Sequence, residues 1–241
     1  MMTLQPGKPF PDERNREIAE AFAREGCVLV PGVFSREEVQ VLKERTDDYF
    51  QRRETLPPHH VSYVNGAFVL RRGADLAPLF ASLTTGEPIW SLVAAVLGRE
   101  PRFNALNVIR NEPGQAISRW HVDDVLEFPL PDDIPRFDAR MRMPVLWFTV
   151  QVALSDITLL EHGPTQYVPG SHYSGRQPVS QEDPVFEGQG PRAVFCHAGD
   201  IYFTNHQAWH RGAPNTSDRI RYVMQLQYAQ RWADARFKGE A

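Results

Sequence analysis

His121 and Asp123 have the residue types and the spacing that could bind one metal ion. Side chains two positions apart in extended backbone point to the same side, so both can reach one ion while Val122 points away. Two imidazoles and one carboxylate on one face of a metal form a known mononuclear iron site and leave the other face open. Because a His-x-Asp pattern is common by chance, the prediction depends on a second histidine elsewhere in the chain.

His210 is the strongest candidate for that second histidine. A turn rich in Gly, Pro, Asn and Ser follows it, and residues 219–228 then alternate between apolar and polar side chains. Arg219 and Arg221 share the polar face of this predicted strand. An arginine that points into a barrel needs an anion, and its planar guanidinium matches a carboxylate through two hydrogen bonds. Two alternatives stay open, because His206 also lies near the end of the preceding strand and Arg221 could pair with an acidic side chain.

The first hundred residues are predicted to form a mainly helical buttress with one strand. Apolar residues at helical spacing predict helices over 17–25, 35–49 and 89–97. The short apolar run Cys27–Val30 predicts the strand. The second helix begins with a capping box, because Ser35 is followed three residues later by Glu38.

From residue 101 onward the sequence changes to short strands separated by Pro, Gly, Asn and Asp, which is typical of an antiparallel sandwich or barrel. The strands are predicted at 103–110, 117–122, 145–154, 165–168, 192–196, 200–204 and 219–228. Residues 125–144 interrupt them with four prolines and charges of both signs, so we expect a surface loop or a lid. Within it, Arg136, Arg140 and Arg142 are expected either to face solvent or to bind an acidic substrate.

These motifs together resemble the phytanoyl-CoA dioxygenase-like family of iron(II)- and 2-oxoglutarate-dependent dioxygenases. The resemblance covers most of the chain, through Gly26–Ser35, Trp120–Asp123, Ala153–His172 and Gly199–Arg221 in that order. It implies a fold that is mainly β with flanking α-helices, built around a jelly-roll, cupin-like double-stranded β-helix over 101–241. It also implies an enzyme that consumes oxygen and 2-oxoglutarate.

The resemblance implies a role for each matching residue. Iron(II) is expected to be bound by His121, Asp123 and His210. The distal carboxylate of 2-oxoglutarate is expected at Arg221, with Arg219 as the alternative. Predicted strands that line the same interior add candidates for hydrogen bonds to 2-oxoglutarate, namely Asn107, Thr149 and Gln151.

The composition favours a folded protein with a small-molecule partner. The 241 residues are 42% hydrophobic and carry a net charge of −4, so we expect a single domain and neither nucleic-acid nor membrane binding. Cys27 and Cys196 lie far apart, which predicts no disulfide and a reducing, cytoplasmic location. Oligomeric state is not predicted by any of these features.

The remaining histidines are expected in less specific roles. His59 and His60 follow two prolines and are expected in an exposed loop, whereas His162 and His197 are expected to be structural. His172 closes a Pro-Gly-Ser-His turn. Two roles are equally expected for it, a hydrogen bond within this turn or a position at the rim of a substrate pocket.

We therefore predict an oxygenase that hydroxylates or otherwise oxidises a small organic molecule, in natural-product metabolism, with succinate and CO₂ as co-products. Because Asp123 is a carboxylate, the ligand set leaves no place for a halide, which favours hydroxylation over halogenation. Two other classes remain open. One is a cupin-like isomerase or hydrolase that does not use 2-oxoglutarate, and the other is a barrel that binds a small molecule without turnover.

Overall fold

The computed structural model describes residues 7–115, 119–123, 125–138 and 140–233. The α-helices are α1 (Asp12–Glu25), α2 (Arg36–Gln51), α3 (Gly73–Leu76), α4 (Pro78–Leu83) and α5 (Ile89–Leu97), and the 3-10 helices are η1 (Arg53–Thr55), η2 (Pro58–His60) and η3 (Ser171–Tyr173). The strands are β1 (Cys27–Val30), β2 (Val61–Val64), β3 (Ala67–Leu70), β4 (Arg102–Asn111), β5 (Trp147–Ala153), β6 (Thr165–Tyr167), β7 (Arg192–Ala193), β8 (Ile201–Asn205), β9 (His210–Gly212) and β10 (Arg221–Ala229).

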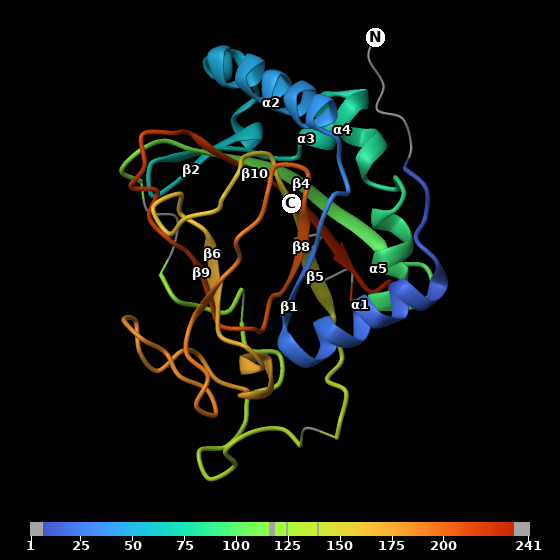
Figure 1. Ribbon diagram of the computed structural model, residues 1–241, viewed down its shortest axis with the longest axis vertical. Coiled ribbons are helices and arrows are strands. Elements are labelled where there is room, and N and C mark those ends of the chain that lie inside the picture. The colour runs from blue at the N-terminus through green and yellow to red at the C-terminus, as the bar shows by residue number, and fades with distance from the viewer. Residues whose placement is uncertain (1–6, 116–118, 124, 139, 234–241) are drawn as a thin grey trace.

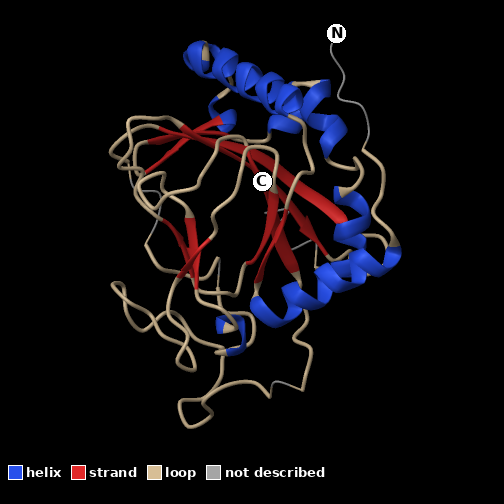
Figure 2. Cartoon of the chain, viewed as in Figure 1, coloured by secondary structure: helices blue, strands red, loops and turns tan. Residues whose placement is uncertain are grey.

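The described strands form two antiparallel sheets (Figure 1). The larger sheet has seven strands in the order β1-β8-β5-β10-β4-β3-β2, and the smaller has the order β7-β6-β9. Figure 2 shows the α-helices gathered along one side of the larger sheet, with the smaller sheet on its other side. Two facing antiparallel sheets with flanking helices are a jelly-roll arrangement, which confirms the predicted fold class.

Strand β10 shows why the two faces of the larger sheet differ. Its side chains alternate, and Tyr222, Met224, Leu226 and Tyr228 are buried in one core cluster with residues of α1, α2, α4 and α5. Each such side chain contributes about 1.5–3 kcal/mol through burial. The residues between them face the smaller sheet, and the space between the two sheets is called the lumen below. The predicted apolar face of this strand is therefore the face that holds the helices.

The helix ends follow the sequence signals. The Ser35 hydroxyl accepts a hydrogen bond from the Glu38 N–H (3.2 Å), and the Glu38 carboxylate accepts one from the Ser35 N–H (2.8 Å), so the predicted capping box starts α2. Gly26 ends α1 with a φ of 78°, a left-handed conformation that glycine adopts without strain. Helix α1 begins at Asp12, five residues before its predicted start, because the polar turn after Pro11 also becomes helical.

The prediction of a single strand in the first hundred residues is wrong. The hairpin β2–β3 joins the edge of the larger sheet beside β4. Its turn residues Asn65 and Gly66 have φ values of 48° and 87°, as a two-residue hairpin turn requires. Asn-Gly between two apolar runs is the sequence signal for such a hairpin. His60 is also not exposed, since it is buried and its Nδ1 lies 3.0 Å from the Arg71 carbonyl oxygen.

Several predicted strands are shorter in the structure. The strand expected over 192–196 is reduced to β7, and the one expected over 219–228 begins only at Arg221. Part of the strand expected over 117–122 lies outside the described residues. Within 119–122, His121 forms an isolated bridge with the first residue of β9, which extends the smaller sheet by one partner.

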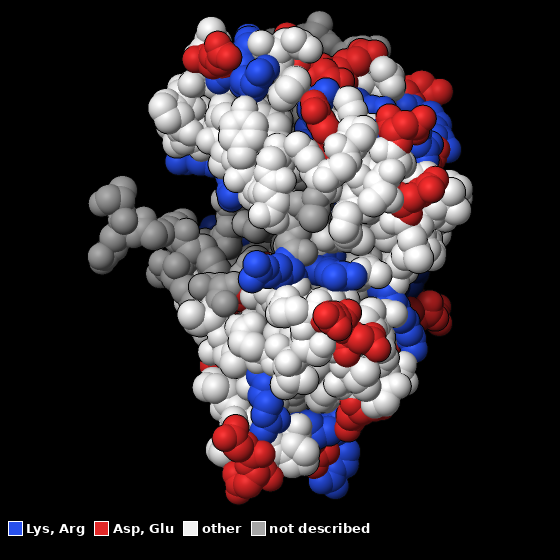
Figure 3. All heavy atoms as spheres, turned by 90° about the vertical axis from the view of Figure 1, so that its left-hand side faces the viewer, with Lys and Arg blue, Asp and Glu red and all other residues white. Residues whose placement is uncertain are grey.

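In the described ranges, no helix combines the length and the apolar character that crossing a bilayer requires. Figure 3 views the face at the left of Figure 1 and shows basic and acidic side chains interspersed with uncharged ones over its described part. Both cysteines are free and buried.

Candidate metal centre

The metal site begins with a backbone pairing that places two histidines opposite each other. The His121 N–H donates to the His210 carbonyl, and the His210 N–H donates to the His121 carbonyl, both at 3.0 Å. Residues that exchange both hydrogen bonds in an antiparallel pair project their side chains to the same face. The two imidazole centroids accordingly lie 4.4 Å apart.

Asp123 joins the pair from two positions further along the chain. Its N–H donates to the His206 carbonyl at 2.7 Å, which holds the segment after His121 extended. The Asp123 Oδ1 atom lies 3.3 Å from His121 Nε2 and 3.5 Å from His210 Nε2. The three ligand atoms all lie within 4.8 Å of one another. The predicted triad is therefore assembled by the fold.

The backbone also orients each imidazole for metal binding. His121 Nδ1 lies 2.6 Å from the Arg119 carbonyl oxygen, and His210 Nδ1 lies 2.8 Å from the Ala208 carbonyl oxygen. A carbonyl oxygen only accepts, so each Nδ1 carries the proton and each Nε2 presents its lone pair to the space beside Asp123. This is the outer hydrogen bonding that metal-binding histidines use, and the donor set fits iron(II).

The electrostatics of the triad suit a cation. Without metal, burial alone would raise the pKa of Asp123, but the charge of protonated His210 and the hydrogen bonds that protonated imidazoles donate lower that pKa well below its ordinary value. Burial alone would lower the pKa of His210. The Asp123 carboxylate outweighs this effect, so the pKa of His210 is raised above its ordinary value. Asp123 is thus ionised at neutral pH, and its charge is directed at the two Nε2 atoms.

Arg221 lies buried on the lumen face of the larger sheet, with 5% of its surface exposed. Its Nη1 donates to the Gly163 carbonyl, and its buried Nε has no hydrogen-bond partner. Burial lowers the pKa of Arg221 to about 10, so the side chain stays cationic at neutral pH. Within the described ranges no carboxylate lies within ion-pair distance of it. A buried cation with an unpaired donor fits a carboxylate ligand.

The backbone conformation of Gly163 directs its carbonyl oxygen toward Arg221. It has a φ of 68°, and a Cβ here would lie 2.9 Å from the Ala213 carbonyl oxygen and 3.0 Å from the Asn215 amide nitrogen. Any other side chain would push segment 162–163 away from the turn that follows β9. The turn, Gly163 and Arg221 are therefore packed as one unit.

The sequence model of the phytanoyl-CoA dioxygenase (PhyH) family matches residues 22–223. The chain belongs to this family. Membership confirms the predicted class, an iron(II)- and 2-oxoglutarate-dependent dioxygenase, and the His-Asp-His cluster agrees with it. Family membership also removes support from the alternative barrels without 2-oxoglutarate or without turnover.

Solved structures of similar fold include two enzymes of nogalamycin biosynthesis and HygX from Streptomyces hygroscopicus. The 2-oxoglutarate-dependent epimerase SnoN from nogalamycin biosynthesis is 21% identical with a TM-score of 0.70, over 91% of this chain and 84% of that chain. The carbocyclase SnoK from the same biosynthesis is 21% identical with a TM-score of 0.65, over 93% and 87%. HygX from Streptomyces hygroscopicus, with nickel and 2-oxoglutarate bound, is 18% identical with a TM-score of 0.71, over 93% and 89%. At these identities the likeness shows the fold.

The dioxygenase lumen is lined by polar side chains in register across neighbouring strands. Asn107, Gln225, Gln151 and Tyr202 are successive partners on β4, β10, β5 and β8. Thr149 lies on the same face of β5, two positions from Gln151. The predicted residues Asn107, Thr149 and Gln151 are all buried, and they lie on the face that also carries Arg221.

Tyr202 is a lumen residue that the sequence reasoning missed. Its hydroxyl lies 2.9 Å from the Thr165 hydroxyl, so this hydrogen bond joins β8 of the larger sheet to β6 of the smaller one. Its neighbours Ile201 and Phe203 belong to the helix-side core, so alternation along β8 was the available signal. Gln225 lies on the predicted polar face of residues 219–228 but was not chosen as a candidate for binding 2-oxoglutarate.

The expectation that Arg219 shares a strand face with Arg221 is wrong. Strand β10 starts at Arg221, so Arg219 lies in the preceding turn and is exposed. Its Nη2 contacts the imidazole of His162. The His162 Nδ1 in turn accepts from the Thr158 N–H at 3.2 Å, as a structural histidine does.

The His206 carbonyl accepts a hydrogen bond from Asp123, but the His206 side chain contacts other residues. Its Nε2 lies 3.0 Å from Glu127 Oε1, and both side chains are nearly fully buried. The imidazole stacks on Trp147 with centroids 4.4 Å apart. The next residue, Gln207, accepts from the Glu127 N–H at 3.0 Å and donates to the Val125 carbonyl at 3.2 Å. Residues 206–207 therefore clamp the segment that follows Asp123.

This clamp leads to a prediction about metal affinity. Glu127→Gln removes the charge opposite His206, so the segment after Asp123 should loosen and iron(II) affinity should fall by about tenfold, as for other outer partners of metal ligands. Chelator competition measures the affinity, with the exposed Glu182→Gln as the matched control. Unchanged affinity in Glu127→Gln would show that the clamp does not position Asp123.

His172 is buried, and its hydrogen bond goes to a helix rather than to its own turn. Its Nε2 lies 3.0 Å from the Ala23 carbonyl oxygen at the end of α1. Burial is the main cause that lowers the pKa of His172 to about 4. The ring is therefore neutral in the folded protein at pH 7 and joins η3 to α1. His59 and His197 are exposed, and His197 lies 3.4 Å from Asp156.

The buried His172 predicts a loss of stability in acid. Because the folded pKa of about 4 lies below the ordinary value of 6.5, only the unfolded chain takes up this proton between those pH values. The free energy of unfolding should fall by about 3 kcal/mol as the pH drops from 6.5 to 4 through this group alone. Urea unfolding across this range should show a shallower dependence for His172→Gln than for wild type. Equal slopes would contradict the assignment.

The loop over 125–144 is fastened to the segment around η3. The Arg176 guanidinium donates to the carbonyls of Pro131 (2.7 Å), Ile134 (2.5 Å) and Pro135 (3.0 Å). The Phe137 N–H donates to the Tyr173 carbonyl at 2.9 Å. The loop therefore packs beside the strands that carry the metal ligands.

The three arginines of this loop differ in their partners. Arg136 forms an ion pair with Glu187 and lies over the Tyr173 ring, and Arg140 forms an ion pair with Asp138. Arg142 is exposed and forms no ion pair within the described ranges. Two of the three charges that could have bound an acidic substrate are thus already neutralised.

Proposed function

We propose that this dioxygenase oxidises a small organic molecule, by hydroxylation or a related oxidation, with succinate and CO₂ as co-products. One observation carries the proposal. The three ligand atoms of His121, Asp123 and His210 converge within 4.8 Å, in the same lumen as a buried Arg221 that lacks a carboxylate partner in the described ranges. A metal triad together with an unpaired buried cation is what a metal-chelating dicarboxylate requires.

In the proposed reaction the triad holds iron(II) through the two Nε2 atoms and the Asp123 carboxylate. Bound iron(II) and 2-oxoglutarate supply the activation of oxygen that the substrate oxidation needs. The carbonyls of Arg119 and Ala208 keep the Nδ1 protons in place, so the imidazoles remain neutral ligands. Three protein ligands leave the remaining positions for cosubstrate and oxygen.

Arg221 is proposed to bind the distal carboxylate of 2-oxoglutarate through its guanidinium. Because Arg221 is buried, this ion pair is stronger than one at the surface. Thr149, Gln151 and Asn107 are proposed to donate hydrogen bonds to the cosubstrate. The Gln151 amide donates to the Thr204 hydroxyl only at 3.5 Å, so it can turn to a ligand at small cost.

A natural product is the substrate class that we propose. The support comes from similar folds, since SnoN has been solved with Fe³⁺, 2-oxoglutarate and a nogalamycin-type ligand, and HygX with hygromycin B. SnoN is an epimerase and SnoK is a carbocyclase, so proteins of this fold catalyse different reactions. The outcome in this protein depends on how its own substrate is oriented.

The proposed function is tested by a screen for succinate release. Purified protein with iron(II), oxygen and 2-oxoglutarate is incubated with a panel of natural products and other small metabolites, and His210→Ala serves as the blank. We expect at least one compound to raise succinate release above the uncoupled background. Release that no compound raises, in protein shown to bind iron and 2-oxoglutarate, would contradict the proposal.

We further propose that the 125–144 loop selects the substrate. Replacing residues 129–136 with a short Gly-Ser linker removes the carbonyls that Arg176 binds while keeping Glu127. The substrate range in the succinate assay should change, and iron(II) affinity should stay within about twofold, because the ligand segment is clamped separately. A substrate range identical to wild type would show that the loop is not a lid.

A further inference from the structure

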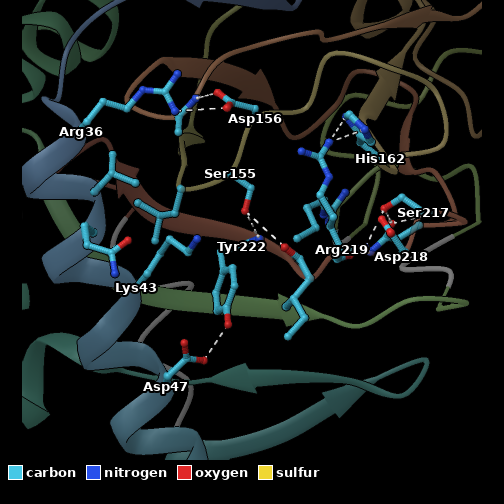
Figure 4. A pocket seen from close by; sticks show the side chains of 17 residues that line it. Arg36, Lys43, Asp47, Ser155, Asp156, His162, Ser217, Asp218, Arg219 and Tyr222 are labelled. Atoms are coloured by element: carbon cyan, nitrogen blue, oxygen red, sulfur yellow. Dashed lines mark hydrogen bonds and ion pairs between the residues drawn. The ribbon is translucent and has the colours of Figure 1, made fainter.

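A second cavity lies on the helix side of the larger sheet, away from the metal triad. It has a volume of about 720 Å³ and is bounded by one face of α2 and by segments 154–156 and 215–222 (Figure 4). Val39, Leu154 and Tyr222 at its floor belong to the core beneath the helices. None of the three metal ligands lines it. Its volume is in the range of small-molecule pockets.

Two cations on opposite walls of this cavity lack an acidic partner. Lys43 projects from α2 with its Nζ 5.1 Å above the Tyr222 ring and forms no ion pair with the described residues. Arg219 projects from the opposite wall, where its Nη2 contacts the imidazole of His162, and it forms no ion pair with the described residues. Figure 4 shows Lys43 and Arg219 on either side of the open space, with Ser155 between them.

Three of the other charges in the cavity lining are already paired. Arg36 is neutralised by Asp156 at 3.1 Å. Asp47 accepts from Arg110 at 3.1 Å and from the Tyr222 hydroxyl at 2.6 Å. Asp218 and Arg221 also line the cavity, and Figure 4 shows Asp218 beside Ser217 on the side away from Lys43. Among the described residues, the lining therefore has three cations without an ion pair, Lys43, Arg219 and Arg221, and one such carboxylate, Asp218.

Ser155 adds a polar group that can turn to a ligand. Its oxygen accepts from the Tyr222 N–H at 3.0 Å, whereas its own hydroxyl donates to the Ile220 carbonyl only at 3.5 Å, the outer limit of a hydrogen bond. Redirecting this proton costs little. A hydroxyl donor between two cations is the environment that an oxyanion prefers.

We propose that this cavity is a second binding site, for a small molecule that carries a carboxylate or phosphate group bound between Lys43 and Arg219. The site shares Arg221 with the lumen but none of the metal ligands, and it does not depend on the proposed function. Its test uses no metal and no turnover, so a failure here leaves the oxidation proposal unaffected.

Calorimetric titration of the metal-free protein with inorganic phosphate and, in a second arm, with citrate tests this site at constant ionic strength. We expect saturable binding of at least one of the two probes. Lys43→Met and Arg219→Met should each weaken it by about tenfold, because each removes a charged hydrogen-bond donor. Arg45→Met is the matched control, since Arg45 is exposed on the same helix and does not line the cavity.

One further result distinguishes this cavity from the metal triad. His210→Ala removes a metal ligand that does not line the cavity, so the metal-free variant should bind the probe as wild type does. No saturable binding of either probe would overturn the proposal. Weakening in the Arg45→Met control equal to that in Lys43→Met and Arg219→Met would also overturn it. Unfolding temperatures verify that each variant is folded.

Discussion

Asp123→Ala is expected to abolish iron(II) binding and, with it, turnover. The carboxylate is the only anionic ligand of the proposed triad, and its removal leaves two neutral imidazoles to hold a divalent cation. The loss of affinity should exceed the roughly 10- to 100-fold that is typical when an outer partner of a metal ligand is removed. Chelator competition and metal analysis after gel filtration measure it.

The matched control for this variant is Asp12→Ala, which removes an exposed carboxylate in the first turn of α1. Its iron content should equal that of wild type. Removing Asp123 also separates the charge on His210 from its partner, so the unfolding temperature of the metal-free protein is measured in parallel. A folded Asp123→Ala protein that retains wild-type iron affinity would show that the carboxylate is not a ligand.

Arg221→Met is expected to weaken 2-oxoglutarate binding while leaving iron(II) affinity unchanged. Methionine keeps much of the apolar stem but removes the buried charge. Breaking a buried ion pair by removal of one partner costs about 3–5 kcal/mol, which corresponds to about two to nearly four orders of magnitude in affinity. Equilibrium binding of 2-oxoglutarate to the iron(II) protein under anaerobic conditions measures the change.

Arg219→Met tests the alternative anchor directly. Arg219 lies in the turn before β10 and contacts His162 outside the lumen, so its removal should change 2-oxoglutarate affinity by less than about twofold. A larger effect of Arg219→Met than of Arg221→Met would reverse the assignment. Because both variants remove one arginine near the start of the same strand, they also control for each other's effect on folding.

The metal triad could be predicted from sequence because its geometry is local. The two positions of His121 and Asp123 need only extended backbone, and one antiparallel pairing then brings His210 opposite His121. Arg221 could be predicted because β10 alternates over nine residues with large apolar side chains on one face. The alternation along this one strand is enough to place Arg221 on its polar face, whatever the rest of the fold.

Other features could not be predicted because they depend on contacts between distant segments. The Glu127–His206 pair joins a loop to the end of β8 across 79 positions, and neither residue shows this in its local pattern. Strand β9 has three residues, too few for alternation to identify it. The position of Arg219 depends on where the turn after His210 ends, which Asn215 fixes by donating to the Arg219 carbonyl at 2.7 Å.

The hairpin β2–β3 is a different case, because its signal was present. Asn65 and Gly66 stand between two apolar runs, and the turn was not interpreted as one. The hairpin pairs with β4, which carries Asn107, and the Arg72 N–H that follows it donates to the Asn107 side chain at 3.3 Å. A segment expected to buttress the barrel thus contributes a strand pair next to the lumen.

The central claim is that iron(II) at the triad and the carboxylate site at Arg221 act on one molecule of 2-oxoglutarate. Anaerobic titration of 2-oxoglutarate into the iron(II) protein, followed by visible absorption, tests it most directly, because only chelation to iron produces a metal-to-ligand charge-transfer band. We predict that the band saturates near equimolar 2-oxoglutarate in wild type, is absent in His210→Ala, and requires far higher concentrations in Arg221→Met. A wild-type protein that binds both iron and 2-oxoglutarate without the band, or variants that titrate as wild type does, would contradict the claim.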